Sequence, residues 1–153
     1  MDMKIIIGAC MVVLCVWLLY SCNDKIEVKQ DYDFALSSWH LQSEIKNGEE
    51  VEIRLTLRRQ GDFLGAEYYL GYIQMEGNGE VYDSEGTFLV NRELCELREI
   101  SGLDVSDPSA QVFTLFYRAL SDKKSVVKFV IEDNFHQHRE LEISFSKDTQ
   151  KEE

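Results

Sequence analysis

The stretch Glu49–Arg59, EEVEIRLTLRR, carries the clearest structural pattern in the chain. Its polar side chains alternate with four aliphatic ones, which are Val51, Ile53, Leu55 and Leu57. Because successive side chains of a strand leave opposite faces, this order predicts a strand with one buried and one exposed face. A helix would scatter the same aliphatic residues around its circumference. Turn residues at 47–48 (Asn-Gly) and 60–62 (Gln-Gly-Asp) predict where the strand begins and ends.

Further strand candidates follow towards the C-terminus. Ala66–Met75 (AEYYLGYIQM) is aromatic and β-prone, and Gln111–Leu120 (QVFTLFYRAL) is the strongest candidate for a buried strand. Shorter candidates are residues 80–82, 87–90, 125–132 and 139–145. Glu93–Ile100 fits either a short helix or an irregular edge strand, and we favour the strand. Asp104–Ser109 holds the only proline, Pro108, and predicts a loop.

These segments amount to about seven strands, with turn signals every eight to twelve residues or so and no long helix. The sequence therefore predicts an all-β fold, an antiparallel immunoglobulin-like β-sandwich, over residues 34–146. The physical reason is burial, since two sheets pressed together hide the apolar face of every strand. Residues 147–153 (KDTQKEE) contain no apolar side chain and predict a disordered tail.

The N-terminus begins with a hydrophobic segment. Residues 5–20 read IIIGACMVVLCVWLLY. As a helix this run would cover roughly 24 Å, less than the ~30 Å hydrocarbon core of a bilayer, which is typical of a signal peptide. The run leads into Leu-Leu-Tyr-Ser-Cys at residues 18–22, which resembles the lipobox of bacterial lipoproteins. We therefore expect residues 1–21 to be a lipoprotein signal peptide, Cys22 to be the lipidation site and residues 22–33 to be a tether.

Two alternatives remain open for the hydrophobic segment. It would serve as an uncleaved single-pass anchor, with Trp17 and Tyr20 at the membrane interface, or as a buried helix of a cytosolic fold. The cysteines agree with the lipoprotein interpretation, because Cys10 and Cys15 would leave with the signal peptide. With Cys22 acylated, Cys95 would be the single thiol of the mature domain, so no intramolecular disulfide is expected. We interpret Cys95 as a small apolar residue rather than a nucleophile.

Charge and motifs argue against several function classes. The chain has 16 basic and 28 acidic residues and a formal net charge of −12, so we expect no direct contact with nucleic acid. Motifs of serine hydrolases, zinc proteases and phosphate-binding loops are absent from the sequence. His136 and His138, with Asp133 or Glu140, would form a metal site on paper, but we favour a solvated hairpin loop. We predict no catalytic, cofactor-binding or metal-binding residue.

Aromatic side chains are the remaining candidates for a binding surface. They make up 11% of the chain, and we expect most of them in the core. Exposed aromatic residues would anchor a partner or stack on sugars. We expect a binding surface either on the strand face of Tyr68–Tyr72 or on an unpaired sheet edge, because unpaired edges are docking templates.

Four blocks that follow the lipobox carry a family resemblance. They are Asn47–Phe63 (NGEEVEIRLTLRRQGDF), Tyr68–Val81 (YYLGYIQMEGNGEV), Phe113–Ser121 (FTLFYRALS) and Val126–Phe135 (VVKFVIEDNF). In this order, across about Tyr32 to Phe145, they resemble the TraQ family of conjugative-transposon proteins. The family usually has Gly after the Asp-Asn-Phe triplet, whereas this chain has His136. A turn with positive φ at this position is therefore in question.

The resemblance implies an exported, β-rich protein encoded among the DNA-transfer genes of a mobile element. Our hypothesis is a non-enzymatic, lipid-anchored protein of the cell envelope, in the periplasm or outer membrane, without a cofactor. It would assist conjugative transfer by contacting protein partners of the transfer apparatus. The alternative is a surface lipoprotein that binds glycan or another extracellular ligand, with Trp39 and Tyr69 as candidate stacking residues. An enzyme is a third hypothesis and would need two polar groups that converge in a pocket.

Overall fold

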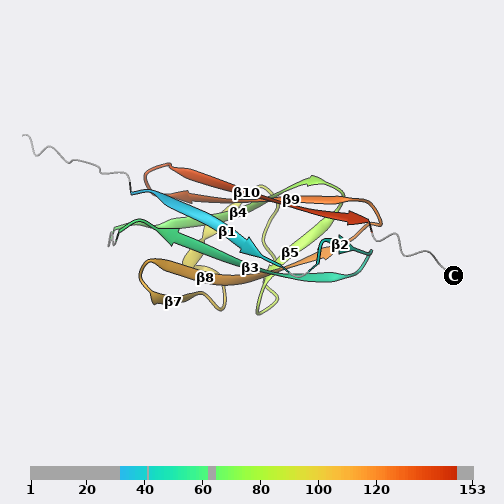
Figure 1. Cartoon of the computed structure of the whole chain (residues 1–153), viewed down its shortest axis with the longest axis horizontal. Coiled ribbons are helices and arrows are strands. Elements are labelled where there is room, and N and C mark those ends of the chain that lie inside the picture. The colour runs from blue at the N-terminus through green and yellow to red at the C-terminus, as the bar shows by residue number, and fades with distance from the viewer. Residues whose placement is uncertain (1–31, 41, 62–64, 148–153) are drawn as a thin grey trace, which may run out of the picture. The chain divides into compact units, whose positions relative to one another are not determined.

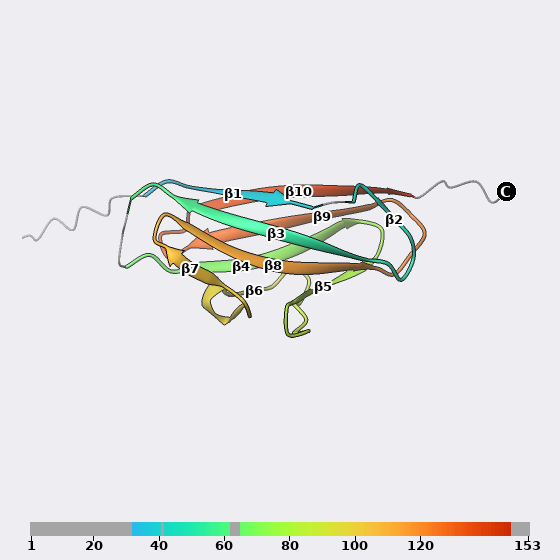
Figure 2. The ribbon, with the colours of Figure 1, turned by 60° about the horizontal axis from the view of Figure 1, so that its bottom comes forward.

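Two sheets make up the part of the chain that the computed structural model describes, which is residues 32–40, 42–61 and 65–147. The expected signal peptide, the lipidation site Cys22 and residues 22–31 of the tether lie outside these ranges, as do residues 148–153. Figures 1 and 2 show the two sheets stacked as a sandwich. The prediction of an all-β fold is confirmed.

The first sheet has the order β1-β3-β8-β5 and is antiparallel throughout. Its strands are β1 (Phe34–Trp39), β3 (Glu50–Arg59), β8 (Ala110–Ala119) and β5 (Gly79–Asp83). β7 (Asp104–Asp107) also pairs with β8, alongside residues that β5 leaves unpaired. β8 therefore has β3 on one side and two shorter strands in succession on the other.

The second sheet has the order β2-β10-β9-β4-β6. Its strands are β2 (Glu44–Ile45), β10 (His138–Lys147), β9 (Ser125–Asp133), β4 (Tyr68–Glu76) and β6 (Leu94–Glu96). All neighbours are antiparallel except β2 and β10, which pair in parallel over two residues. A 3-10 helix, η1 (Leu97–Glu99), follows β6 directly.

The core lies between the sheets and is built from alternating positions. The four aliphatic residues of β3 are each at most 1% exposed, as the alternation predicts. They meet buried side chains of the second sheet, which include Leu70, Phe129, Ile131 and Phe145. Burial of one such side chain contributes about 1.5–3 kcal/mol, so the sandwich is held mainly by these two inner faces.

The predicted number of strands was wrong, since the described residues form ten strands rather than about seven. β1 was not predicted, because Phe34–Trp39 (FALSSW) has only a weak alternation. The predicted loop at Asp104–Ser109 contains β7, whose exposed residues gain their extended form by pairing with β8. Conversely, residues 87–90 form only an isolated bridge between Phe88 and Tyr82. Whether these short segments form strands depends on pairing with a neighbouring strand, and the local sequence does not contain that information.

Two ambiguous segments are settled by the structure. Glu93–Ile100 contains both a strand, β6, and the helix η1, because Leu97 and Ile100 turn inwards at a three-residue step. The doubt about a left-handed turn at His136 was wrong, since His136 has φ 65°. The backbone N–H of His136 donates to the carbonyl oxygen of Asp133 at 3.0 Å, which holds the tight turn without a glycine.

Candidate protein-binding surface

The strand face predicted as an aromatic surface is largely buried. Tyr68 and Tyr72 point into the core and are 7% and 5% exposed. The ring of Tyr68 meets the ring of Phe34 edge-on, with centroids 5.3 Å apart. Burial raises the pKa of both tyrosine hydroxyls above its ordinary value. Tyr69 lies on the opposite face of β4, half-buried, and its hydroxyl donates to Glu67. Tyr68 and Tyr72 are therefore part of the core rather than of an exposed binding surface.

A different aromatic group lies on the outer face of the first sheet. The ring of Tyr82 on β5 stacks on the ring of Phe116 on β8, with centroids 5.7 Å apart and planes at 17°. Phe88, from the segment beside β5, tilts against Tyr82 at 5.4 Å and is 55% exposed. Arg118 on β8 completes the group, which we call the aromatic cluster, defined as Tyr82, Phe88, Phe116 and Arg118. Tyr82 and Phe88 are six residues apart in the sequence, whereas Phe116 and Arg118 come from the distant strand β8.

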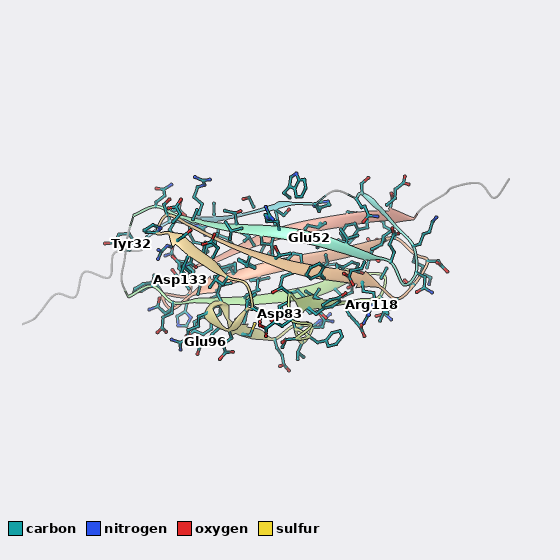
Figure 3. The ribbon with its side chains drawn as sticks, turned by 90° about the horizontal axis from the view of Figure 1, so that it is seen from below. Tyr32, Glu52, Asp83, Glu96, Arg118 and Asp133 are labelled. Atoms are coloured by element: carbon teal, nitrogen blue, oxygen red, sulfur yellow. The ribbon has the colours of Figure 1, made fainter. Side chains whose placement is uncertain are left out.

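Arg118 gives the aromatic cluster its charge and its rigidity. Its guanidinium carbon lies 5.5 Å from the ring centroid of Tyr82 and 6.0 Å from that of Phe88, within the range of cation–π attraction. One guanidinium nitrogen donates to Glu80 at 2.6 Å, directly across the β5–β8 pair. The hydroxyl of Tyr82 donates to Glu50 of β3. Figure 3 shows Arg118 on this face of the ribbon.

The cluster was missed at the sequence level for a specific reason. Alternation along β8 places Phe116 and Arg118 on the outer face, and the same argument applies to Tyr82 on β5. Their meeting depends on the register that pairs Tyr82 with Phe116 and Glu80 with Arg118. Phe88 joins the cluster through an isolated β-bridge to Tyr82, which no periodicity of the sequence predicts.

The histidines considered as metal ligands do not converge on a site. His136 is exposed in the β9–β10 hairpin, with Nδ1 3.1 Å from the Glu132 carboxylate. Asp133 is 3% exposed, and its Oδ1 accepts the backbone N–H groups of both Phe135 and Gln137. Among the described residues, no group of three or more His, Cys, Asp or Glu side chains is placed to hold a metal ion.

The buried carboxylate of Asp83 has a structural role. One oxygen accepts the backbone N–H groups of Glu85 and Thr87, and the other accepts that of Ser101. Desolvation alone would raise the pKa of Asp83, but these hydrogen bonds outweigh it and hold the pKa below its ordinary value. The carboxylate therefore stays charged and ties the turn after β5 to the segment after η1 (Figure 3).

Cys95 is half-buried on β6. Burial, followed by the nearby carboxylate of Glu99, raises the pKa of its thiol above the ordinary value. The thiol donates to the carbonyl oxygen of Leu70 at 3.4 Å. A thiol with a raised pKa is a poor nucleophile, so the geometry agrees with a packing role.

The outer face of the second sheet carries a shallow apolar hollow of about 510 Å³. Its apolar lining includes Ile73, Met75, Leu94 and Val130. The ammonium of Lys128 lies at the rim and binds Glu140 at 2.8 Å. This hollow is a second exposed apolar feature, and its lining also includes Tyr72 and Arg92.

A family model described as TraQ conjugal transfer protein matches residues 4–148. The chain belongs to the TraQ family. The TraQ match covers residues 4–21 of the predicted signal peptide and Cys22, as well as the whole described sandwich. No curated protein matches the chain.

Three solved structures similar to this TraQ family chain come from the genus Bacteroides. A crystal structure of a conjugative transposon lipoprotein from Bacteroides eggerthii is 30% identical, with a TM-score of 0.62, and covers 75% of this chain and 98% of its own. A lipoprotein from Bacteroides thetaiotaomicron is 29% identical, with a TM-score of 0.60, covering 84% of this chain and 90% of its own. A conjugate transposon protein from Bacteroides vulgatus is 28% identical, with a TM-score of 0.61, covering 85% and 97%.

Membership of the TraQ family places the chain among proteins with a general role in conjugal transfer. One of these structures is described as a conjugative transposon lipoprotein and another as a lipoprotein, which supports an envelope-associated lipoprotein. Within residues 32–40, 42–61 and 65–147, no helix has the length and hydrophobicity needed to cross a bilayer.

Proposed function

We propose that this TraQ family protein is a non-enzymatic lipoprotein, anchored through Cys22, that assists conjugative transfer by contacting proteins of the transfer apparatus. The observation that carries this proposal is the family match over residues 4–148, which includes the lipobox-like segment before Cys22. Two or more acyl chains on Cys22 would hold the domain stably at a membrane, since each buried CH₂ contributes about 0.8 kcal/mol.

We also assign the sandwich to the immunoglobulin-like class. The seven longer strands run β1-β3-β8-β5 in one sheet and β10-β9-β4 in the other. This order corresponds to strands A-B-E-D and G-F-C of a constant-type immunoglobulin domain. The short strands β2, β6 and β7 are then additions at the sheet edges. Such a scaffold offers rigid outer faces on which contact residues are held in place.

The aromatic cluster is our proposed contact face for a protein partner. Tyrosine, phenylalanine and arginine are enriched in protein interfaces, and tyrosine and arginine are common hot-spot residues. The ring stacking and the Glu80 contact hold the cluster rigid before binding, which lowers the entropy cost of an interface. The net charge of −12 opposes contact with DNA, so we propose that the DNA itself is not bound.

The non-enzymatic part of the proposal rests on how the polar groups are used. The buried carboxylates of Asp83 and Asp133 accept hydrogen bonds from turns, and the thiol of Cys95 donates to a strand carbonyl. The groups that would have to act as acid, base or nucleophile therefore already stabilise the fold. We propose placement at the membrane, rather than chemistry, as the mechanism.

A transfer assay with a matched pair of cysteine variants tests the proposal. We expect deletion of the gene to lower transfer frequency and the wild-type gene to restore it. Cys22→Ser removes the acylated thiol and is expected to leave the deletion uncorrected, whereas Cys95→Ser changes a packed thiol and is expected to restore transfer. Mass spectrometry of the purified wild-type protein should show acyl chains on Cys22. Unchanged transfer after deletion would contradict the proposed role, and an intact start methionine without acyl chains would contradict the anchor.

Glycan binding is the alternative that exposed aromatic side chains favour. Trp39 and Phe88 are 57% and 55% exposed, and flat exposed rings are surfaces on which sugars stack. This alternative predicts affinity for an oligosaccharide that falls on Trp39→Ala or Phe88→Ala. The half-buried Tyr69 is a weaker candidate than the sequence suggested, since its hydroxyl already contacts Glu67. A glycan-array screen with the full chain in detergent separates the two functions.

A further inference from the structure

Several sheet edges of the sandwich are covered by other parts of the chain. Beside β5, the backbone N–H of Leu89 donates to the carbonyl oxygen of Val81 at 2.9 Å. Beside β4, beyond β6, the N–H of Gln74 donates to the side chain of Asn91 at 3.0 Å. These contacts occupy the outward backbone groups, so a foreign strand cannot pair there.

Two other edges are protected by charge. β7 is four residues long, begins and ends with aspartate, and has an irregular register with β8. β10 has a basic or acidic side chain at several positions, among them Arg139, Glu140 and Glu142. Short length, bulges and charged side chains are the common devices by which proteins prevent unwanted strand pairing.

β1 has none of these devices. Its sequence Phe34–Trp39, FALSSW, contains no charged residue, no proline and no glycine. It pairs with β3 in a continuous register from Phe34↔Arg59 to Trp39↔Arg54, without a bulge. Among the described residues, no strand pairs with its other edge. Figure 1 shows β1 along the side of the first sheet, next to β10.

The register identifies which backbone groups of β1 face outwards. The N–H of Gln60 donates to the carbonyl oxygen of Asp33 at 2.9 Å, so Asp33 and Gln60 form a hydrogen-bonded pair. Hydrogen-bonded and non-hydrogen-bonded pairs alternate along an antiparallel ladder, so the backbones of Ala35, Ser37 and Trp39 bond to β3. The N–H and C=O groups of Leu36 and Ser38 therefore point away from β3. Arg139 confirms the alternation, since its Nε donates to the outward carbonyl of Phe34 at 3.1 Å. The outward N–H and C=O groups of Leu36 and Ser38 therefore remain for pairing with a further strand.

Charge next to β1 selects the kind of strand that fits. Arg54 and Arg58 are exposed on the outer face of β3, directly across from Trp39 and Ala35. Their neighbours on β8 are Thr114 and Ala110, and neither arginine forms an ion pair with a described residue. Glu50 and Glu52 lie on the same face towards the start of β3, so the basic part of this face is the segment from Arg54 to Arg58 that pairs with β1. An added strand would lie beyond β1, so its acidic side chains would meet these arginines where the long arginine side chains extend across β1.

The inner side of the edge is apolar. Leu36 on β1 and Leu141 on β10 are half-buried against the core, and both lie where the inner face of an added strand would pack. A second copy of the chain is a poorer match, because its own β1 has no acidic side chain to place near Arg54 and Arg58.

We propose that β1 is the docking edge for an extended segment of a partner protein in which apolar side chains alternate with acidic ones. This inference rests on the proposed function, because the partner would belong to the transfer apparatus. The segment would add a strand to the first sheet, with its backbone bonded to Leu36 and Ser38, its apolar residues towards Leu141 and its acidic residues towards Arg54 and Arg58.

A designed peptide tests the proposal directly. The probe is an acetylated, amidated octapeptide, Val-Glu-Val-Thr-Val-Glu-Val-Thr, titrated into the full chain in detergent and followed by amide hydrogen exchange. We expect it to slow exchange at Leu36 and Ser38 and to leave β7 unchanged. A peptide with Lys in place of Glu should bind at least about tenfold more weakly, because it meets the two arginines with like charge.

Protein variants separate edge pairing from other modes of binding. Ser38→Pro removes one outward N–H, and Arg54→Glu with Arg58→Glu reverses the local charge; both should weaken binding of the glutamate peptide by about tenfold or more. The matched control is Arg98→Glu, an exposed arginine on η1, which should bind the peptide normally. Thermal unfolding of each variant shows that the fold is retained.

Four results with the purified protein would overturn the proposal. They are absence of peptide binding, protection of Leu36 and Ser38 already in the free chain, protection at another strand, and a dimer in sedimentation that Ser38→Pro dissolves. In cells, normal transfer with Ser38→Pro would also overturn it, provided that deletion of the gene lowers transfer. That last result would leave the proposed role in conjugation standing.

Discussion

The ring of Tyr117 on β8 lies parallel to the ring of Phe145 on β10, with centroids 5.4 Å apart and planes at 10°. The two strands belong to different sheets, so this pair joins the two halves of the sandwich. Both side chains are fully buried, and the hydroxyl of Tyr117 accepts a hydrogen bond from the amide of Gln74 at 3.1 Å. The Tyr117 ring also limits what fits beside it on β5.

Gly79→Ala should destabilise the fold through this ring. A Cβ atom at Gly79 would lie 2.3 Å from the ring of Tyr117, far inside van der Waals contact. Overpacking of this kind costs about 1–3 kcal/mol, and we expect a loss in that range from urea unfolding. In a Tyr117→Leu background the methyl group has room, so the same substitution should cost much less. Equal costs in the two backgrounds would show that the ring is not the cause.

Asp83 should make stability depend on pH. Its pKa is lowered in the folded state, so the charged carboxylate contributes stability above its unfolded pKa, and this contribution is lost as the pH falls through the folded pKa. We expect Asp83→Asn to cost about 1–3 kcal/mol at pH 7, because three backbone N–H groups lose a charged acceptor.

The difference between wild type and Asp83→Asn should shrink as the pH is lowered towards the folded pKa. Urea unfolding at neutral and acidic pH measures this directly. Glu85→Gln is the matched control, because the side chain of Glu85 is exposed and its neutralisation should have little effect. A constant difference in the free energy of unfolding across the whole pH range would show that the asparagine destabilises the fold for steric reasons rather than through the lost charge.

His136→Gly should stabilise the protein. In a residue other than glycine, φ 65° is a left-handed conformation that costs roughly 1–2 kcal/mol. Glycine avoids this strain but loses more backbone entropy on folding. We expect a net gain of about 0.5–1 kcal/mol in the free energy of unfolding. His138→Gly, two residues on and within β10, should instead lower stability by about 0.5–1 kcal/mol. A loss of stability with His136→Gly would mean that its contact with Glu132 outweighs the strain.

Phe88→Ala should separate function from stability at the aromatic cluster. Phe88 is more than half exposed, so its truncation should change the free energy of unfolding by less than about 1 kcal/mol. As an interface anchor it should reduce transfer frequency about tenfold, as loss of one hot spot would. Met75→Ala is the matched control, since Met75 is 51% exposed but lies on the second sheet. Equal transfer in both variants would remove the cluster from the proposed contact face.

Local sequence predicted the elements of this fold whose pattern is strongest. β3 alternates polar and apolar residues from Glu50 to Arg58, and the structure buries all four apolar ones. The predicted inward residues of β8 (Phe113, Leu115 and Tyr117) are buried too, as are Ile143 and Phe145 of β10. The lipobox-like segment before Cys22 and the order of four blocks were also enough to indicate the TraQ family. Alternation is a local property of an extended backbone, so it is readable without knowing the neighbours of a strand.

Only the tertiary structure decided which face of each strand is covered by its neighbours. Tyr68 and Tyr72 were candidates for an exposed surface until Phe34 and the facing sheet buried them. Register brought Tyr82 against Phe116 and left the uncharged edge of β1 beside Arg54. These relationships join residues that are tens of positions apart, and the free energy that selects them comes from contacts between strands. No periodicity within a single strand contains that information.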